Sequence, residues 1–235
     1  MLKSISSLKE LVYPVICLSC SSLGMKICSK CLLMWRIKPI KSNIQKYPLY
    51  FSADYNEFTG SIILAAKESA NKDAIDLLAT SIARSIILAI KDLGIYLPII
   101  LTPIPSQYSA NRRRGRDHIE DLTKVVISKL QTKDVFAVYL PLLIPAKKIQ
   151  DQSKLNSQQR KANMYQAFLT RQSEISIGGV ILIDDLVTTG ASILEGIRAL
   201  NEAKITISAV VTACAVGRNS LIRYAPQILE FHNFD

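Results

Sequence analysis

The sequence lacks an apolar run of the roughly 18 residues that a membrane-spanning helix requires. The longest candidate, residues 82–104, is interrupted by three charged residues and two prolines. A shorter apolar segment, residues 11–20, directly follows Lys9 and Glu10 and contains two cysteines, which does not suit a signal peptide. We therefore expect a cytoplasmic protein with no membrane span.

Histidine is scarce as well, because His118 and His232 are the only two in the chain. Neither stands in a Ser–His or Cys–His arrangement, so nucleophilic catalysis by such a pair is not indicated. We interpret both histidines as structural or surface residues. The Gly-x-x-x-x-Gly-Lys-Ser/Thr loop of P-loop ATPases is also absent, as are internal repeats and low-complexity segments.

The chain does have enough apolar residues for a core, at 49% of 235 residues. This allows one α/β domain of ordinary size and a small accessory module. We place the module and a basic connector at residues 1–50, and the main domain at residues 51–235. The net charge of +10 favours anionic partners such as phosphates or nucleic acid, although a basic surface without a specific partner would give the same value.

The most informative segment is VILIDDLVTTGAS at residues 180–192. Its four apolar residues predict a strand buried on both faces of a parallel sheet, and two acids follow at the edge where such sheets bind ligands. Ionised carboxylates accept hydrogen bonds, and the vicinal diol of a ribose supplies two donors. The candidate ligand-binding residues are Asp184, Asp185, Thr188, Thr189, Gly190, Ala191 and Ser192.

After the acids, a turn around Gly190 leads into a predicted helix at residues 191–203. Glycine tolerates a strained turn and lets a ligand approach closely, and the N-terminus of a helix favours a phosphate. Diol acceptors and a phosphate site so close together indicate a ribose 5-phosphate. The alternatives are an ATPase Walker B acid pair, which would need the missing P-loop, and an ordinary strand–turn–helix with capping hydroxyls.

Two Cys-x-x-Cys pairs, separated by seven residues, lie near the N-terminus. Each pair places two thiolates on one edge of a metal ion, and two pairs complete a tetrahedron. In a protein without a signal peptide, four such cysteines indicate structural zinc more than disulfides. An iron–sulfur cluster and non-metal thiols, reduced or disulfide-linked, remain as alternatives. The proposed ligands are Cys17, Cys20, Cys28 and Cys31, whereas Cys214 is expected in the core.

Alternating strand and helix patterns predict a mostly parallel sheet with right-handed crossovers. A short lead helix is expected before the cysteines, a polar loop region at residues 147–164, and a tail at residues 216–235 that we do not interpret. The expected helices are residues 73–92, 117–131 and 191–203, and the expected strands are residues 97–104, 134–142, 179–185 and 205–214.

Residues 180–192 resemble the phosphoribosyl diphosphate (PRPP) signature of type I phosphoribosyltransferases at every position, and the whole layout resembles the ComF family. The resemblance spans about residues 14–218. Where that family usually has Phe-Asn-Gln after Arg-Gly, this chain has Arg116, Asp117 and His118. The other matching features are the double Cys-x-x-Cys, Tyr55, Gly60, Lys67, the Pro103-Ile104-Pro105 turn, Arg112–Gly115, Gln152, Leu155, Arg160, Asn163, Ala167 and Phe168.

The resemblance implies a type I phosphoribosyltransferase-like α/β fold, a parallel sheet flanked by helices, with a small N-terminal four-cysteine zinc module. It implies that Asp184 and Asp185 are the catalytic residues and bind the ribose hydroxyls, with Mg²⁺ arriving on PRPP. It also implies that residues 188–192 bind the 5-phosphate. Six basic residues are expected to contact pyrophosphate or DNA, with solvated or packing roles as the alternative. These are Arg112, Arg113, Arg114, Arg116, Lys67 and Arg160.

Three functions follow from the resemblance. The first is a competence-type protein that binds PRPP or a related ribose 5-phosphate and assists uptake of single-stranded DNA, together with DNA-uptake proteins. The second is an active, Mg²⁺-dependent phosphoribosyltransferase that transfers ribose 5-phosphate to a base or another small acceptor. The third is a PRPP sensor without chemistry.

Overall fold

The computed structural model describes residues 14–35, 38–106, 108–146, 163–171 and 178–217. The lead helix, Gln152, Leu155, Arg160, His232 and nearly all of the 147–164 and 216–235 segments lie outside these residues. The strands are β1 (Ile40–Ile44), β2 (Tyr47–Asp54), β3 (Ile99–Pro103), β4 (Ala137–Tyr139), β5 (Leu143–Pro145), β6 (Phe168–Thr170), β7 (Val180–Val187) and β8 (Ile207–Ala215). The helices are α2 (Ser29–Leu32), α3 (Glu57–Ser69), α4 (Lys72–Leu93), α5 (Tyr108–Arg114), α6 (His118–Gln131) and α8 (Ala191–Glu202).

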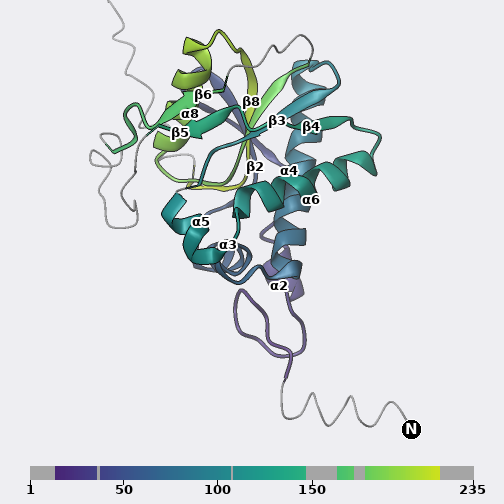
Figure 1. Cartoon of the computed structure of the whole chain (residues 1–235). Coiled ribbons are helices and arrows are strands. Elements are labelled where there is room, and N and C mark those ends of the chain that lie inside the picture. The colour runs from purple at the N-terminus through teal and green to yellow at the C-terminus, as the bar shows by residue number, and fades with distance from the viewer. Residues whose placement is uncertain (1–13, 36–37, 107, 147–162, 172–177, 218–235) are drawn as a thin grey trace, which may run out of the picture.

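A six-stranded sheet with the order β1-β2-β8-β7-β3-β4 forms the centre of the protein (Figure 1). Only β1 is antiparallel to its neighbour, and the other four pairings are parallel. β5 and β6 form a separate antiparallel pair. The predicted α/β class, with a mostly parallel sheet flanked by helices, is confirmed.

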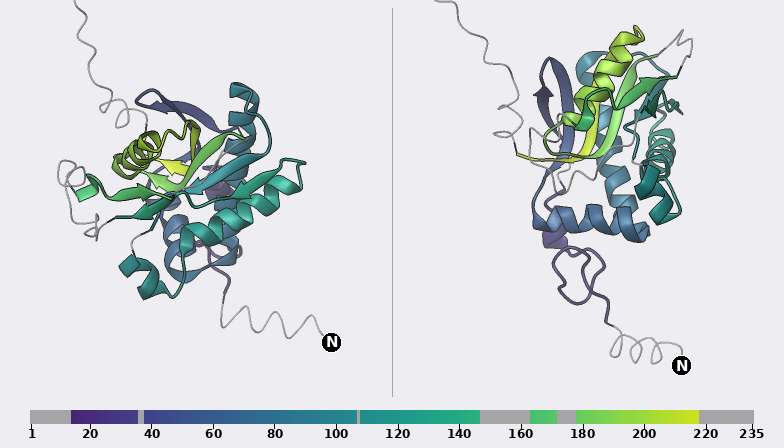
Figure 2. Two further views of the ribbon diagram at one scale, coloured as in Figure 1. Left: turned by 45° about the horizontal axis from the view of Figure 1, so that its top comes forward. Right: turned by 60° about the vertical axis from the view of Figure 1, so that its left-hand side comes forward.

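Helices lie on both sides of the sheet (Figure 2). The side chains of α3, α4 and α6 share one hydrophobic core with Ile181 and Ile183 of β7. On the other face, α8 and the β5–β6 pair share a second core with Val180 and Leu182 of the same strand. The two cores follow the alternation of side chains along a strand.

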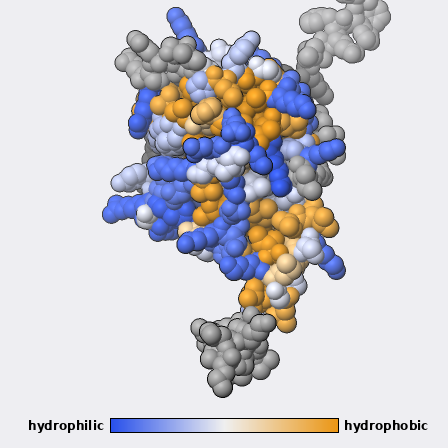
Figure 3. Space-filling view, turned by 90° about the vertical axis from the view of Figure 1, so that its right-hand side faces the viewer, coloured by the Kyte–Doolittle hydropathy of each residue, from blue (hydrophilic) through white to orange (hydrophobic). Residues whose placement is uncertain are grey.

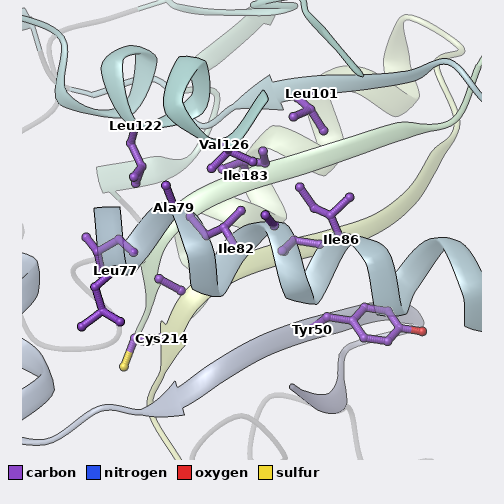
Figure 4. Packing of buried hydrophobic residues seen from close by; sticks show 14 of the residues in the cluster. Tyr50, Leu77, Ala79, Ile82, Ile86, Leu101, Leu122, Val126, Ile183 and Cys214 are labelled. Carbon is purple, nitrogen blue, oxygen red and sulfur yellow. The ribbon is translucent and has the colours of Figure 1, made fainter. Parts of the chain in front are cut away.

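α4 shows how local sequence sets one of these elements. The side chain of Asn71 caps its first turn by accepting from the backbone N–H groups of Asp73 and Ala74, and Gly94 ends it with φ at 61°. Between these ends, isoleucines at helical spacing face the sheet. Figure 4 shows Ile82 and Ile86 directed toward the buried residues of α6, β3 and β7.

Two stretches differ from the sequence-based expectation. Residues 36–50, expected as a connector, contribute β1 and the start of β2, because the alternating burial of Ile40–Ile44 suits an edge strand despite its polar residues. The strand expected at residues 134–142 is shorter, and β4 covers only Ala137–Tyr139. None of the helices in the described ranges is long and apolar enough to cross a membrane.

The cysteine segment, residues 14–35, contains the four cysteines and α2. It projects from the sheet at the bottom of Figure 1. Trp35, which is 3% exposed, joins it to the core of α3 and α4. Ser19 also donates a hydrogen bond to the carbonyl of Phe58 in α3, and Lys26 pairs with Asp73 in α4. Apolar side chains gather on the surface of this projection (Figure 3), where the exposed ones are Val15, Ile16, Leu23, Met25, Leu32 and Leu33.

Candidate functional site

The two predicted acids lie in β7, between β8 and β3 in the middle of the sheet. The strand contains both acids, as expected, and continues two residues beyond the expected end, to Val187. The Pro103–Pro105 turn lies beside them, because the N–H of Ile104 donates to the carbonyl of Ile183. The carboxyl ends of β3 and β7 therefore bring the predicted turns together at the edge where parallel sheets bind ligands.

The turn after β7 depends on a glycine. Gly190 has φ at 74°, and a Cβ at this position would lie 2.3 Å from Cδ1 of Ile44 in β1. α8 begins at the next residue, with no side-chain cap at Gly190 and no acid in its first turn. Thr189 Oγ1 accepts the N–H of Ala191 at 3.4 Å. A helix start without a side-chain cap at its N-cap residue and without an acid in its first turn favours an anion.

The two acids leave the strand on opposite sides, but their carboxyl groups remain in hydrogen-bonding contact with each other. Ile183 packs into the core of α3, α4 and α6, and Asp185 faces the same side, where it meets Lys67 of α3 and His118 of α6. Because successive side chains of a strand alternate, the Cα–Cβ bond of Asp184 leaves the strand on the side of α8. Asp184 Oδ1 also accepts the N–H of Asp185 at 2.8 Å.

Asp185 is enclosed, with 4% of the residue exposed. Its Oδ2 lies 3.4 Å from Lys67 Nζ and 3.3 Å from His118 Nε2. Lys67 was predicted from the family pattern, whereas His118 was interpreted as structural or surface and given no partner. The spacing of His118, Leu122 and Val126 at four-residue intervals was the available signal, because it places the histidine on the buried stripe of α6.

The surroundings make the two carboxyl groups electrostatically different. Burial alone would raise the pKa of Asp185, but Lys67 and His118 outweigh burial and hold that pKa below its usual range. Burial raises the pKa of Asp184 well above its ordinary value, and the charge of Asp185 raises it further. The pKa of Lys67 is raised by the neighbouring Asp185. Asp185 is thus the acid that carries the charge most readily.

The arginine segment divides into internal and exposed members. The Arg114 side chain is 6% exposed and pairs with Glu68 of α3 at 2.7 Å. Arg116 donates to the carbonyls of Ala66 and Lys67, and pairs with Asp121 at 3.1 Å. Arg112 and Arg113 are exposed on α5. Arg160, the remaining predicted cation, lies outside the described residues.

The four predicted zinc ligands come together. All four Sγ atoms lie within 4.8 Å of one another, and those of Cys20 and Cys28 are 3.6 Å apart. Thiolates around a tetrahedral zinc, at about 2.3 Å from it, are separated by about 3.8 Å. The donor set and its spacing therefore fit a structural zinc ion with no open position.

Backbone groups already shape the cysteine cluster. The N–H of Cys28 donates to Sγ of Cys17 at 3.3 Å, and the N–H of Ser21 donates to the carbonyl of Cys17. Burial alone would raise the pKa of Cys17, but backbone hydrogen bonds lower it to about 6, while burial raises the pKa of Cys31 to about 12. Cys214, the fifth cysteine, is buried in β8 as predicted.

No family model matches the chain, and no curated protein matches it. Among solved structures, similarity is found to adenine phosphoribosyltransferase from Trypanosoma brucei, crystallised in complex with AMP, pyrophosphate and ribose-5-phosphate. The match covers 90% of this chain and 89% of that chain, with 13% sequence identity and a TM-score of 0.37.

Proposed function

We propose that the chain binds PRPP, or a related ribose 5-phosphate, at the carboxyl end of β7. The observation that carries the proposal is the order of groups there: a carboxylate facing the side of α8, a glycine turn, and an uncapped helix N-terminus. The carboxylate would accept from the ribose diol. The N–H groups of the turn and the first turn of α8, together with the hydroxyls of Thr188, Thr189 and Ser192, would hold the 5-phosphate.

The residues at this edge fit a Mg²⁺ ion that arrives with the diphosphate, because carboxylate oxygens are the donors it takes from proteins. When bound, the ion would neutralise negative charge on the pyrophosphate. Lys67 and the exposed Arg112 and Arg113 are the cations of this chain that we assign to the same pyrophosphate. If transfer occurs, these residues act by positioning the substrate and by stabilising charge as C1 of the ribose becomes cationic.

Isothermal titration with PRPP and Mg²⁺ tests the proposal. We expect binding by the wild-type chain and a loss of at least about tenfold in affinity for Asp184→Asn, because the amide offers the diol one acceptor oxygen where the acid offers two. Glu202→Gln is the matched control, since it removes an acid from the far end of α8. Equal affinity in all three proteins, or no binding to any phosphorylated pentose, would refute the site.

Beyond binding of PRPP, we propose a role in the uptake of single-stranded DNA, which the resemblance to the ComF family implies. The net charge of +10 and the exposed arginines of α5 support contact with a phosphate backbone. Fluorescence anisotropy with a short single-stranded oligonucleotide should then show binding that weakens as salt is added. Absence of binding at low salt would contradict this role. The active phosphoribosyltransferase and the PRPP sensor would then remain.

An active phosphoribosyltransferase is the alternative. It predicts Mg²⁺-dependent release of pyrophosphate from PRPP with a nucleobase or another acceptor, and loss of that release in Asp184→Asn. PRPP binding without turnover and without DNA binding would instead identify a sensor.

We also propose that the four cysteines hold one structural zinc ion, and that the chain divides into this module and a sheet domain. The hairpin of β1 and β2 then belongs to the sheet domain, because both strands are part of the six-stranded sheet. One equivalent of zinc in the colourless purified protein is the expected result. Visible absorbance typical of an iron–sulfur cluster would contradict it.

A further inference from the structure

We propose that His118 is a positioning residue that, together with Lys67, holds Asp185 on the α3–α6 side of β7, so that Asp184 alone contacts the sugar. The inference rests on the proposed function, because it divides the work between the two acids of that site. It differs from the sequence-based expectation, in which both carboxylates bind the ribose hydroxyls.

The first support is the way Asp185 is enclosed. Two groups from different helices converge on one of its oxygens, since Lys67 Nζ and His118 Nε2 both lie within 3.4 Å of Oδ2. His118 is 1% exposed and Asp185 4%. A ribose hydroxyl would have to displace one of these groups to reach Oδ2, whereas Asp184 is only half-buried.

The second support is that His118 has no other hydrogen-bonding partner among the described residues. Neither of its ring nitrogens makes a hydrogen bond that meets ordinary geometry, and Asp185 Oδ2 is likewise without one. Buried polar atoms are normally hydrogen-bonded. The carboxylate at 3.3 Å is the group that a small rotation of the ring would satisfy.

The third support is the framework that carries the two residues. Asp117 caps the N-terminus of α6 by accepting from the N–H groups of Ile119 and Glu120, which fixes the position of His118 at its first turn. Arg116 donates to the backbone carbonyls of Ala66 and Lys67 at the end of α3. The segment that presents the histidine therefore also holds the backbone of the lysine, and Lys67 and His118 approach Asp185 as one unit.

The contact is tested first in the ligand-free chain by ¹H–¹³C NMR of the histidine rings. The chain has only two histidines, so the variant His232→Gln assigns the resonance of His118. We expect Asp185→Asn to shift that resonance and Glu202→Gln to leave it in place. An unchanged His118 resonance in Asp185→Asn would overturn the proposal without any bearing on PRPP.

The role in the site is tested by titrating PRPP and Mg²⁺ into His118→Gln and His118→Leu. Glutamine retains a side-chain N–H that can reach the carboxylate, so its affinity should stay near that of the wild type. Leucine should lose about tenfold, as expected for one hydrogen bond to a charged group. The melting temperatures should be compared, because a purely structural role would lower stability and leave the affinity of the folded fraction unchanged.

Two further outcomes separate this inference from the proposed function. If Asp185→Asn loses as much affinity as Asp184→Asn while His118→Leu loses none, both acids contact the sugar and the division of work is wrong. If the wild-type chain binds no phosphorylated pentose, the proposed function is wrong, and so is the role of His118 in binding. The contact between His118 and Asp185 is still tested by the NMR experiment, which does not depend on PRPP.

Discussion

The cysteine segment and the sheet are each stabilised by different interactions. In the sheet, buried strands pack against helices on both faces, and residues such as Ile82, Leu101 and Ile183 are fully enclosed. In the cysteine segment, two of the four clustered thiols and Trp35 are buried, while Leu23 and Leu33 are largely exposed. A segment this short cannot enclose an apolar core of its own. Its order must come from the cysteine cluster and from the joint with α3 and α4.

This contrast teaches that one chain can contain two kinds of stability. Burial of apolar surface is distributed over many residues, so a single substitution weakens the sheet by degrees. The proposed zinc site would concentrate the free energy in a few bonds, and losing the ion would remove it at once.

Removal of zinc should abolish the order of the cysteine segment and leave the sheet folded. Structural zinc supplies about 10–16 kcal/mol of binding free energy in small zinc modules. Hydrogen exchange should therefore lose all protection at residues 17–31 after treatment with a chelator, while the amides of β7 and β8 stay protected. Cys31→Ser should have the same effect, whereas Cys214→Ala should retain the zinc. Joint loss of protection in both regions would show that they do not fold separately.

Ile82→Ala should weaken the sheet and leave the cysteine segment intact. Ile82 is fully buried in the core between α4 and β7, and truncating such a side chain costs about 2–5 kcal/mol. Urea denaturation followed by circular dichroism measures the loss in free energy of unfolding, and elemental analysis should still find one zinc. A cost below about 1 kcal/mol, or loss of zinc, would break the contrast.

Lys26→Ala probes the joint between the two regions and should have the smallest effect. The ion pair of Lys26 with Asp73 spans 2.9 Å, but its side chains are 65% and 40% exposed. Exposed pairs contribute about 0–1 kcal/mol, so the unfolding free energy should change by less than that in the same urea experiment. A larger loss would assign the joint to this ion pair rather than to the buried Trp35.

Much of this structure was predictable where chemistry and periodicity agree locally. The strand and helix around Asp184 and Gly190 were predicted because their residue types follow one another without a gap, and the clustering of the cysteines followed from spacing alone. α4 was predicted from its isoleucine stripe. In each case the residues that predict the structure lie within or next to a single helix or strand.

The rest depends on contacts between distant segments. β1 was missed because Lys41 and Asn43 conceal an edge strand whose alternate residues are buried. His118 begins α6 and Asp185 lies in β7, far apart in the sequence, so no local pattern pairs them. Arg114 and Arg116 look like free cations in the sequence, but the fold brings the end of α3 to them.

The position of Trp35 has a practical consequence. It is the only tryptophan of the chain, and it lies where the cysteine segment meets the helices of the sheet. Its intrinsic fluorescence therefore reports on one place in the molecule without a label. Red-shifted emission that precedes any loss of helical signal during heating would mean that the two regions separate before the sheet melts.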